Sequence, residues 1–333
     1  KSLINSDQVD FMLTTATPET VNPVSDACEA AGVPCLSTGM PWEPWYFGRG
    51  AKPGQPSPFK WTYHFGFGIA NFAKAYISTW NGPVTTNKKV AFLQPNDADG
   101  NALRNLFGPI LEKAGFKVID PGPYENGTAD YSAQIAKFKA EQCEIFTSGP
   151  IPPDFAVFWR QAAQQGLTKQ IKIASVSKTC LFPSQVQSLG SLGPKIATVA
   201  FWHPTFPYSS SLFGETSQQL SDNYEGKTGR QWNQMLGDNV ALFDAGIATL
   251  KASGNPKDKA AIAKAMSSLK VMTPVGELDF TKGPVPNCYP MVFAGAQWDN
   301  AKAGSKFKVD LTIIENADDP KIPVAAKLRP YNA

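Results

Sequence analysis

The sequence predicts an α/β fold in which parallel sheets flanked by helices are divided between two lobes. Short apolar segments alternate with amphipathic segments along most of the chain, and strands joined through helices pair in parallel with right-handed crossovers. The length of 333 residues exceeds the ~250 to 300 residues at which a single core stops growing. Beyond His203 the alternation gives way to longer helical segments, so the late part of the chain could return to either lobe.

The opening residues predict a strand, a helix and a second strand. The apolar segment Val9–Leu13 predicts the first strand, which runs into a turn rich in threonine. A helix through Val24 and Ala30 ends at Gly32, and residues 33–36 form the second strand. Ligands collect at the carboxyl ends of parallel strands, so the loops after these two strands are the first candidates for a binding site.

The middle of the chain repeats this alternation as a self-contained lobe. Gly115 and Gly166 are expected to end two of its helices, because glycine readily adopts the left-handed conformation found after a last turn. The apolar spacing predicts strands over residues 88–94, 116–119, 144–147, 171–175 and 196–202, and helices over residues 103–114, 132–140 and 155–165.

The last third of the chain changes its pattern. The segment 48–58, far upstream, is rich in Pro and Gly and predicts a linker or an ordered loop. After His203 the sequence predicts helices over residues 213–224, 239–251 and 257–269, followed by strands over residues 276–280, 291–294 and 307–313.

Composition and motifs exclude several classes of function. The formal net charge of +3, without a basic run, argues against a nucleic-acid partner. There is no GxSxG motif, and neither His64 nor His203 lies in a loop at the carboxyl end of a strand, so an enzyme is not expected. Asp97 and Asp99 supply only half of a calcium loop, and neither a metal nor a cofactor is expected.

The cysteines and the opening residues were checked for signs of export from the cytoplasm, of a metal site and of a membrane anchor. Cys28, Cys35, Cys143, Cys180 and Cys288 include no CxxC pair, so no zinc site is expected. An exported protein could hold one or two disulfides, whereas apolar surroundings favour buried free thiols at Cys28 and Cys35. No apolar run approaches the ~18 residues that cross a bilayer, and the opening KSLINSDQVD matches neither a signal peptide nor a lipidation site.

The loops that follow the predicted strands are rich in hydroxyl groups and partly aromatic. They read TTATPET, STGMPWEPW, QPNDADG, SGPIPPD and SVSKTC. Such loops offer hydrogen-bond donors, acceptors and stacking surface to a small polar or aromatic solute. The same residue types are ordinary turn formers and helix caps, so each of them also has a purely structural interpretation. Trp42 and Trp45 could stack on a solute or cover the core of their own loop.

The order of these elements resembles a known family. The segment VDFMLTTATPETVNPVSDACEAAGVPCLSTG, the segment KVAFLQPNDADGNALRNLFGPILEKAGFKV, and GDNVALFDAGIATLKASG with TPVGELDF are similar to type I periplasmic solute-binding proteins of ABC importers. Within that family the resemblance is to the branched-chain amino-acid-binding branch. FKWTYHF is similar to the family's first crossing between lobes.

The resemblance implies a two-lobed fold with three crossings and no catalysis. Lobe 1 is expected over residues 1–61 and 205–288, and lobe 2 over residues 62–204 and 289–333. Family members begin with a further strand, helix and strand, so the first lobe is expected to be incomplete here. The implied partners are a small-molecule solute and an ABC permease in the membrane. The implied protein is a monomer, periplasmic or extracellular and membrane-tethered, and its lobes close on the solute by hinge motion.

The resemblance also implies which residues bind the solute. They are Thr14, Thr15, Thr17, Ser37, Thr38, Gly39 and Trp42 of the first lobe, and Asp97, Asp99, Ser148, Gly149, Ser175 and Ser177 of the second.

One departure from the family bears on the solute. Amino-acid binders hold the ammonium with an acidic residue in the loop that here reads SVSKTC, where Lys178 stands among hydroxyls. An aromatic or hydroxylated carboxylate is therefore favoured over an ordinary amino acid, unless Asp97 or Asp99 replaces the missing acid. A sensory ectodomain and an α/β enzyme are the alternative classes.

Overall fold

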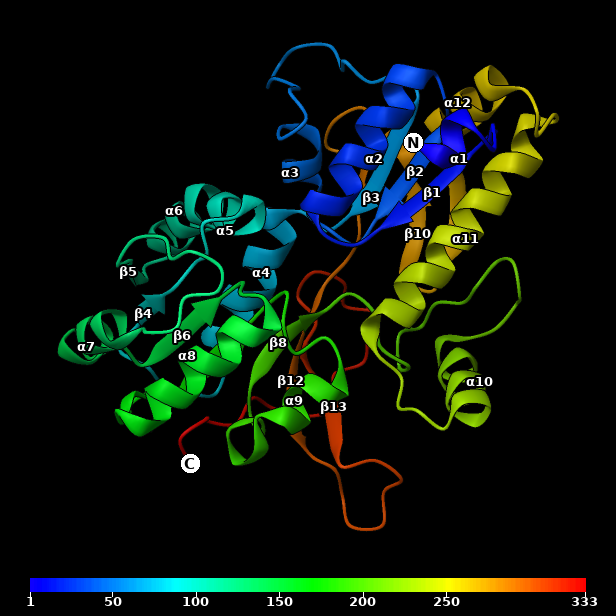
Figure 1. The fold of residues 1–333 in the computed structure, drawn as a ribbon. Coiled ribbons are helices and arrows are strands. Elements are labelled where there is room, and N and C mark those ends of the chain that lie inside the picture. The colour runs from blue at the N-terminus through cyan, green and yellow to red at the C-terminus, as the bar shows by residue number, and fades with distance from the viewer. The chain divides into compact units, whose positions relative to one another are not determined.

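The computed structural model describes residues 1–333, and the chain divides into two compact units (Figure 1). Unit 1 comprises residues 1–68, 201–228 and 234–292, and unit 2 comprises residues 69–200, 229–233 and 293–333. Residues 62–68, which the sequence assigned to the second lobe as a crossing, belong to unit 1, because residues 62–66 form a strand of its sheet. None of the helices combines the length and the apolar character needed to cross a bilayer.

Unit 1 is built on a parallel sheet of four strands. Its order is β1 (Met12–Thr15), β2 (Cys35–Thr38), β3 (Thr62–Gly66) and β11 (Cys288–Pro290). A separate antiparallel hairpin pairs β9 (Lys270–Thr273) with β10 (Gly276–Asp279). The helices of this unit are α1 (Ser2–Asn5), α2 (Pro18–Ala31), α3 (Trp42–Tyr46), α10 (Ser217–Thr228), α11 (Gln234–Ser253), α12 (Lys259–Ser267) and the 3₁₀ turn η4 (Phe280–Lys282).

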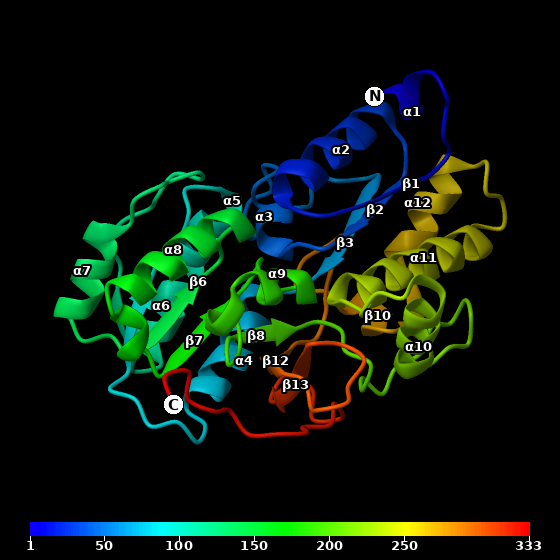
Figure 2. The same cartoon turned by 60° about the horizontal axis from the view of Figure 1, so that its bottom comes forward.

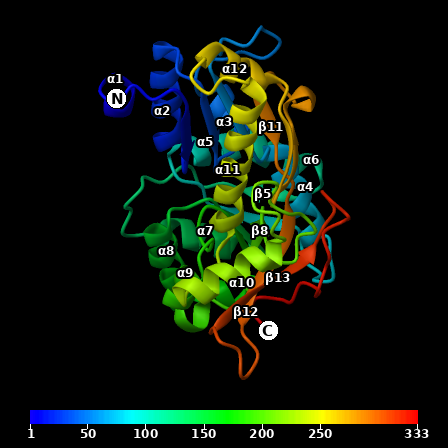
Figure 3. The same ribbon diagram turned by 90° about the vertical axis from the view of Figure 1, so that its right-hand side faces the viewer.

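Side-chain alternation along β1 and β2 places different helices on the two faces of this sheet. Met12 packs in a cluster with Cys28 of α2, whereas the next residue, Leu13, lies against Gly246 of α11. Successive residues of a strand point to opposite faces, so α2 covers one face and α11 the other. Figure 3 shows α11 as a long yellow helix with α12 beyond its carboxyl end.

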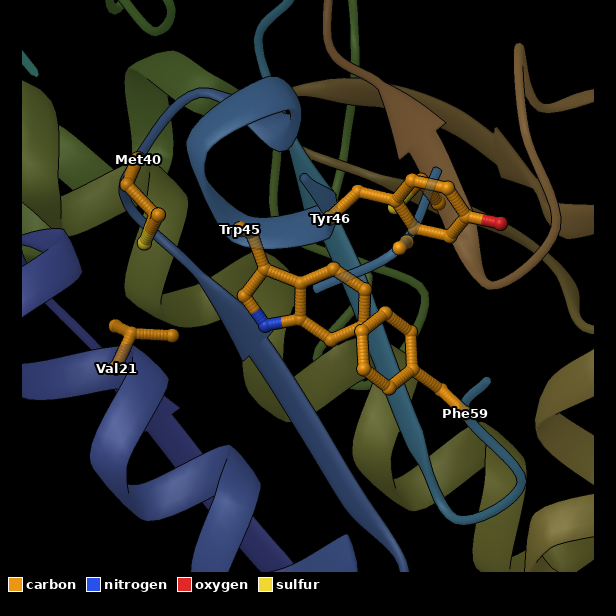
Figure 4. Packing of buried hydrophobic residues seen from close by; sticks show 7 residues of the cluster. Val21, Met40, Trp45, Tyr46 and Phe59 are labelled. Atoms are coloured by element: carbon orange, nitrogen blue, oxygen red, sulfur yellow. The ribbon is translucent and has the colours of Figure 1, made fainter. Parts of the chain in front are cut away.

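An aromatic cluster fills the space between α2, α3 and the loop before β3. Val21, Met40, Trp45, Tyr46 and Phe59 converge there (Figure 4), and the Trp45 side chain is fully buried. The Trp45 and Phe59 rings lie 5.1 Å apart, centroid to centroid. Trp45 is therefore a core residue, and of its two alternatives only the packing role fits.

Unit 2 contains a mixed sheet of seven strands. Five of them pair in parallel, and β12 and β13 continue the sheet antiparallel beyond β8. Its order is β13 (Val309–Glu315), β12 (Ala294–Asn300), β8 (Ala197–Ala200), β7 (Ile173–Val176), β6 (Ile145–Ser148), β4 (Lys89–Phe92) and β5 (Lys117–Ile119). The helices are α4 (Ile69–Trp80), α5 (Ala98–Ala102), the π-helical turn η1 (Leu103–Phe107), α6 (Gly108–Lys113), α7 (Ser132–Ala140), α8 (Pro152–Gln164), α9 (Pro183–Ser188), and the 3₁₀ turns η2 (Leu167–Lys169) and η3 (Gly190–Leu192).

Helices cover both faces of the unit 2 sheet. The Phe146 ring of β6 stacks on Phe158 of α8 at 4.9 Å, and α8 runs along this sheet in Figure 2. On the other face the indole N–H of Trp80, at the end of α4, donates to the hydroxyl of Ser175 at 2.9 Å. The α/β class with parallel sheets flanked by helices is confirmed, with an antiparallel pair added at one edge of the second sheet.

Candidate functional site

The strand ends of unit 1 bring four of the expected hydroxyl residues together. In the register of β1 and β2, Thr14 lies opposite Ser37 and Thr15 opposite Thr38. The sequence placed Thr14 and Thr15 in a turn, which is wrong, because both belong to β1. β-branched threonines fit an extended strand, so the pairing continues to its polar end.

The hydroxyl of Ser37 is occupied inside the unit. It lies 2.9 Å from Nδ1 of His64 and 3.1 Å from the carbonyl of Tyr63. Because a carbonyl only accepts, Nε2 of His64 donates to Met40 O at 3.0 Å, and Nδ1 accepts. Burial lowers the pKa of His64 to about 3, so the ring is neutral at neutral pH. The His64 ring stacks on Trp45, which makes this histidine part of the packing beneath the strand ends.

Thr38 is also paired, and its partner is a residue that was not among the sequence candidates. Its hydroxyl donates to Oδ1 of Asp238 on α11 at 2.7 Å, and both side chains are buried. Burial raises the pKa of Asp238 to about 7, against the opposing effect of the Thr38 and Thr15 hydroxyls. Oδ2 of Asp238 and Oγ1 of Thr15 are buried and make no well-formed hydrogen bond, although the Thr15 hydroxyl lies near enough to act on the Asp238 carboxyl.

Gly39, directly after β2, is required by its surroundings. Its φ is +90°, and a Cβ atom there would lie 2.6 Å from Oγ1 of Thr15. Glycine at this position keeps space next to the threonine hydroxyl. Thr17 precedes the first turn of α2 as its N-cap residue but makes no side-chain capping bond. Trp42 begins α3, and its half-buried ring lies 5.8 Å from that of Phe47 at the edge of the aromatic cluster.

In unit 2 the two candidate aspartates are held by one lysine. Nζ of Lys178 lies 2.8 Å from Asp97 and 3.0 Å from Asp99, and all three side chains are at most 14% exposed. Burial alone would lower the pKa of Lys178, but the Asp99 and Asp97 carboxylates outweigh it and the pKa is raised. Asp97 also accepts from the backbone N–H of Gly100 as the N-cap of α5. Both carboxylates are therefore neutralised within the unit.

The carboxyl ends of β6 and β7 carry the remaining candidates. Ser148 ends β6 with its hydroxyl buried; this hydroxyl makes no well-formed hydrogen bond but lies near enough to the Tyr124 phenol to oppose the rise of that group's pKa. Ser177, after β7, donates its backbone N–H to Ser148 O. Gln94, after β4, accepts from Gly149 N at 3.0 Å, while its amide Nε2 has no partner. Ser175 is occupied by Trp80. At the carboxyl ends of β4 and β6, Gln94 Nε2 and Ser148 Oγ thus lack a well-formed hydrogen bond.

Asp238 and Gln94 lie at the same strand ends as the residues predicted from the sequence but were not among them. Asp238 lies on the buried face of α11 with Ala241, Leu242 and Ala245, at the spacing of one helical face. An acidic residue in such an apolar stripe is a signal that helical periodicity alone could have revealed. Gln94 follows β4 directly and lay within the QPNDADG loop, where the aspartates drew attention instead.

Two α/β units with polar strand ends define a solute-binding architecture of the periplasmic type. The chain matches the family model described as periplasmic binding protein over residues 1–302, and it belongs to this family. It is therefore a non-enzymatic solute-binding protein, and family membership implies a periplasmic or extracellular location.

Solved structures with the same fold are similar to this chain at low sequence identity. A solute-binding protein from R. palustris in complex with 4-hydroxybenzoate has a TM-score of 0.74 at 15% identity, covering 97% of this chain and 81% of that chain. One from Rhodopseudomonas palustris BisB5 with 3,4-dihydroxybenzoic acid has a TM-score of 0.69 at 17% identity, with 96% and 82% covered. The leucine-binding protein LivK from Thermotoga maritima has a TM-score of 0.70 at 16% identity, with 95% and 83% covered. The comparison with curated protein sequences gave no match.

Proposed function

We propose that this chain is the solute-binding component of an ABC uptake system and that its solute is a hydroxylated aromatic carboxylate. The observation that carries the proposal is a set of buried polar atoms that lack a well-formed hydrogen bond at the strand ends of the two units, namely Thr15 Oγ1, Ser148 Oγ and Gln94 Nε2. Buried polar groups in folded proteins are nearly always hydrogen-bonded, so unsatisfied ones gathered at strand ends are suited to a ligand.

The distribution of charge favours a carboxylate over an ammonium group. An ammonium needs an unpaired carboxylate, and Asp97 and Asp99 are both held by Lys178. The Ser148 hydroxyl and the Gln94 amide are neutral donors, which a carboxylate can accept from without competition. Lys178 has three N–H donors and directs two of them at aspartates, so one remains for an anion.

An aromatic ring in the solute fits the side chains of the first unit. Trp42 begins α3, three residues after Gly39, and is half-buried at the edge of the aromatic cluster. Relatives in fold bind 4-hydroxybenzoate and 3,4-dihydroxybenzoic acid. A solute bearing an amine is the second candidate, because no cationic group acts on the buried Asp238.

Two substitutions test the proposed site. Removing an unsatisfied buried hydroxyl leaves the stability of the unliganded protein unchanged or higher, whereas removing a ligand contact weakens binding. Thr15→Val and Ser148→Ala should therefore keep or raise Tm without solute, yet weaken 4-hydroxybenzoate binding by about tenfold or more in titration calorimetry. Ser175→Ala is the contrast, since it leaves the buried Trp80 N–H unpaired and should lower Tm.

The outcomes separate the candidates. If the protein binds leucine tightly and does not bind 4-hydroxybenzoate, its solute bears an amine and the aromatic carboxylate is ruled out. Unchanged affinity for every solute in both Thr15→Val and Ser148→Ala would refute the site. Loss of uptake of the bound solute in cells that lack this protein would support the transport role.

A further inference from the structure

Two of the five cysteines lie side by side in unit 1. Cys28 belongs to the last turn of α2, Cys35 is the first residue of β2, and both side chains are fully buried. They share one small cluster with Val33, and both are free thiols in the structure. The Cys28 thiol lies near enough to Cys35 to raise its pKa.

The backbone between them forces this proximity. Gly32 ends α2 in the left-handed conformation with φ of 65°, and Val33 N donates back to Cys28 O at 2.9 Å. The chain therefore reverses within a few residues and enters β2 directly beneath the helix. Cys35 lies opposite Met12 in the register, and Met12 packs in the same cluster as Cys28. Cys35 therefore points to the face of the sheet that α2 covers.

We propose that Cys28 and Cys35 form a disulfide bond in the exported protein, linking the end of α2 to the start of β2. Each thiol gives up its hydrogen, one S–S bond forms, and the electron pair passes to a disulfide oxidant of the export compartment, which is reduced to two thiols. The family's periplasmic or extracellular location supplies such an oxidising environment. The link braces β2, whose carboxyl end carries Ser37 and Thr38.

The pKa shifts of the two thiols indicate which of them attacks the oxidant first. The neighbouring Cys35 thiol lowers the pKa of Cys28, and the Cys28 thiol together with burial raises the pKa of Cys35. Cys28 is therefore the thiol that ionises first and attacks the oxidant, and Cys35 then resolves the mixed disulfide.

The other three cysteines have no such neighbour. Burial raises the pKa of Cys143 and of Cys180 to about 12 and raises that of Cys288, and the groups that act on these thiols are not cysteines. These three are expected to remain thiols.

Thiol counting tests the proposal on the whole chain, exported into a bacterial periplasm and purified without reductant. The protein is unfolded in guanidinium with excess iodoacetamide and weighed by mass spectrometry. We expect three alkylated cysteines before reduction and five after dithiothreitol, from the five in the chain. Trypsin leaves both cysteines in the peptide 2–49, because no Lys or Arg lies between Lys1 and Arg49. That peptide should be unalkylated and two hydrogens lighter than its reduced form.

Two variants make the count specific. Cys28→Ser should give four alkylated cysteines because Cys35 is released, and Cys143→Ser, the control, should give two. Reduction should lower Tm of the wild type by a few degrees and leave that of Cys28→Ser unchanged. Five alkylated cysteines in unreduced wild type, or a link from peptide 2–49 to another peptide, would overturn the proposal.

Discussion

Asp238 is a buried acid at the point where two site strands meet a helix. It has no cationic partner among the groups that act on it, and only the hydroxyls of Thr38 and Thr15 counter the effect of its burial. Burying a carboxylate without a counter-charge is unfavourable, which is why its pKa rises to about 7. Near neutral pH the side chain therefore exchanges between a carboxylate and a neutral acid that can donate a proton to a neighbour.

The raised pKa makes the stability of unit 1 depend on pH. Unfolded Asp has a pKa of ~3.9, so the folded state binds its proton more tightly and stability is greatest below about pH 4. Raising the pH to 8 should lower the free energy of unfolding by an amount on the order of 4 kcal/mol. The Asp238→Asn variant keeps an acceptor for Thr38 but has no proton to lose. Its free energy of unfolding should therefore change much less with pH than that of the wild type.

Urea unfolding of both proteins between pH 4.5 and 8 provides the measurement. Asp222→Asn, at an exposed position on α10, is the control and should keep the wild-type slope. Identical slopes in wild type and Asp238→Asn would show that Asp238 does not hold its proton in the folded state.

At the scale of single residues the sequence located the strand-end loops but not the partners of their side chains. The hydroxyls of Ser37, Thr38 and Ser175 are all satisfied by residues 26 to 200 positions away in sequence. Such pairings are set by tertiary packing, and nothing in the local sequence separates a satisfied hydroxyl from an unsatisfied one.

At the scale of elements, α11 is positioned by the close approach of its first turn to Trp202. A Cβ atom on Gly237 would lie 2.0 Å from Cγ of Trp202, whose indole N–H donates to Ser217 at 3.1 Å. The absence of a side chain at Gly237 lets the fully buried indole lie against the helix, one residue before Asp238. The register of α11 against the sheet therefore depends on this glycine.

A pair of glycine substitutions tests this contact. Gly237→Ala should destabilise the protein by roughly 2 kcal/mol or more, because Trp202 must move within a packed core. Gly226→Ala is the matched control: it lies within α10 with open space around it and should stabilise by about 0.5–1 kcal/mol. Chemical denaturation measures both, and equal effects of the two changes would contradict the account.

Elements with clean periodicity could be predicted from sequence, and others could not. The helix over residues 132–140 was confirmed with the bounds of α7, and Gly115 and Gly166 follow helices with positive φ as expected. The strands predicted over 9–13 and 33–36 lie two to three residues further on, because their polar ends pair with each other. The helix α4 was missed: residues 69–80 follow FKWTYHF, which was interpreted as a crossing, and were assigned to no element.

At the scale of the whole molecule, the α/β class and the family could be predicted because each βαβ element leaves its own pattern. The antiparallel strands β12 and β13 close one edge of the second sheet and were seen only as isolated apolar pieces. The placement of residues 62–68 in unit 1 was also not predictable, because an apolar strand of either lobe would have the same sequence pattern.

The proposed function requires that this chain bind a small organic acid and release it unchanged. Equilibrium dialysis against isotopically labelled 4-hydroxybenzoate, followed by unfolding and mass spectrometry of the released compound, tests it most directly. We expect binding to saturate at one molecule per chain and the compound to be recovered intact. Recovery of a chemically altered product, or no saturable binding of 4-hydroxybenzoate or of any other aromatic or amino acid offered, would contradict it.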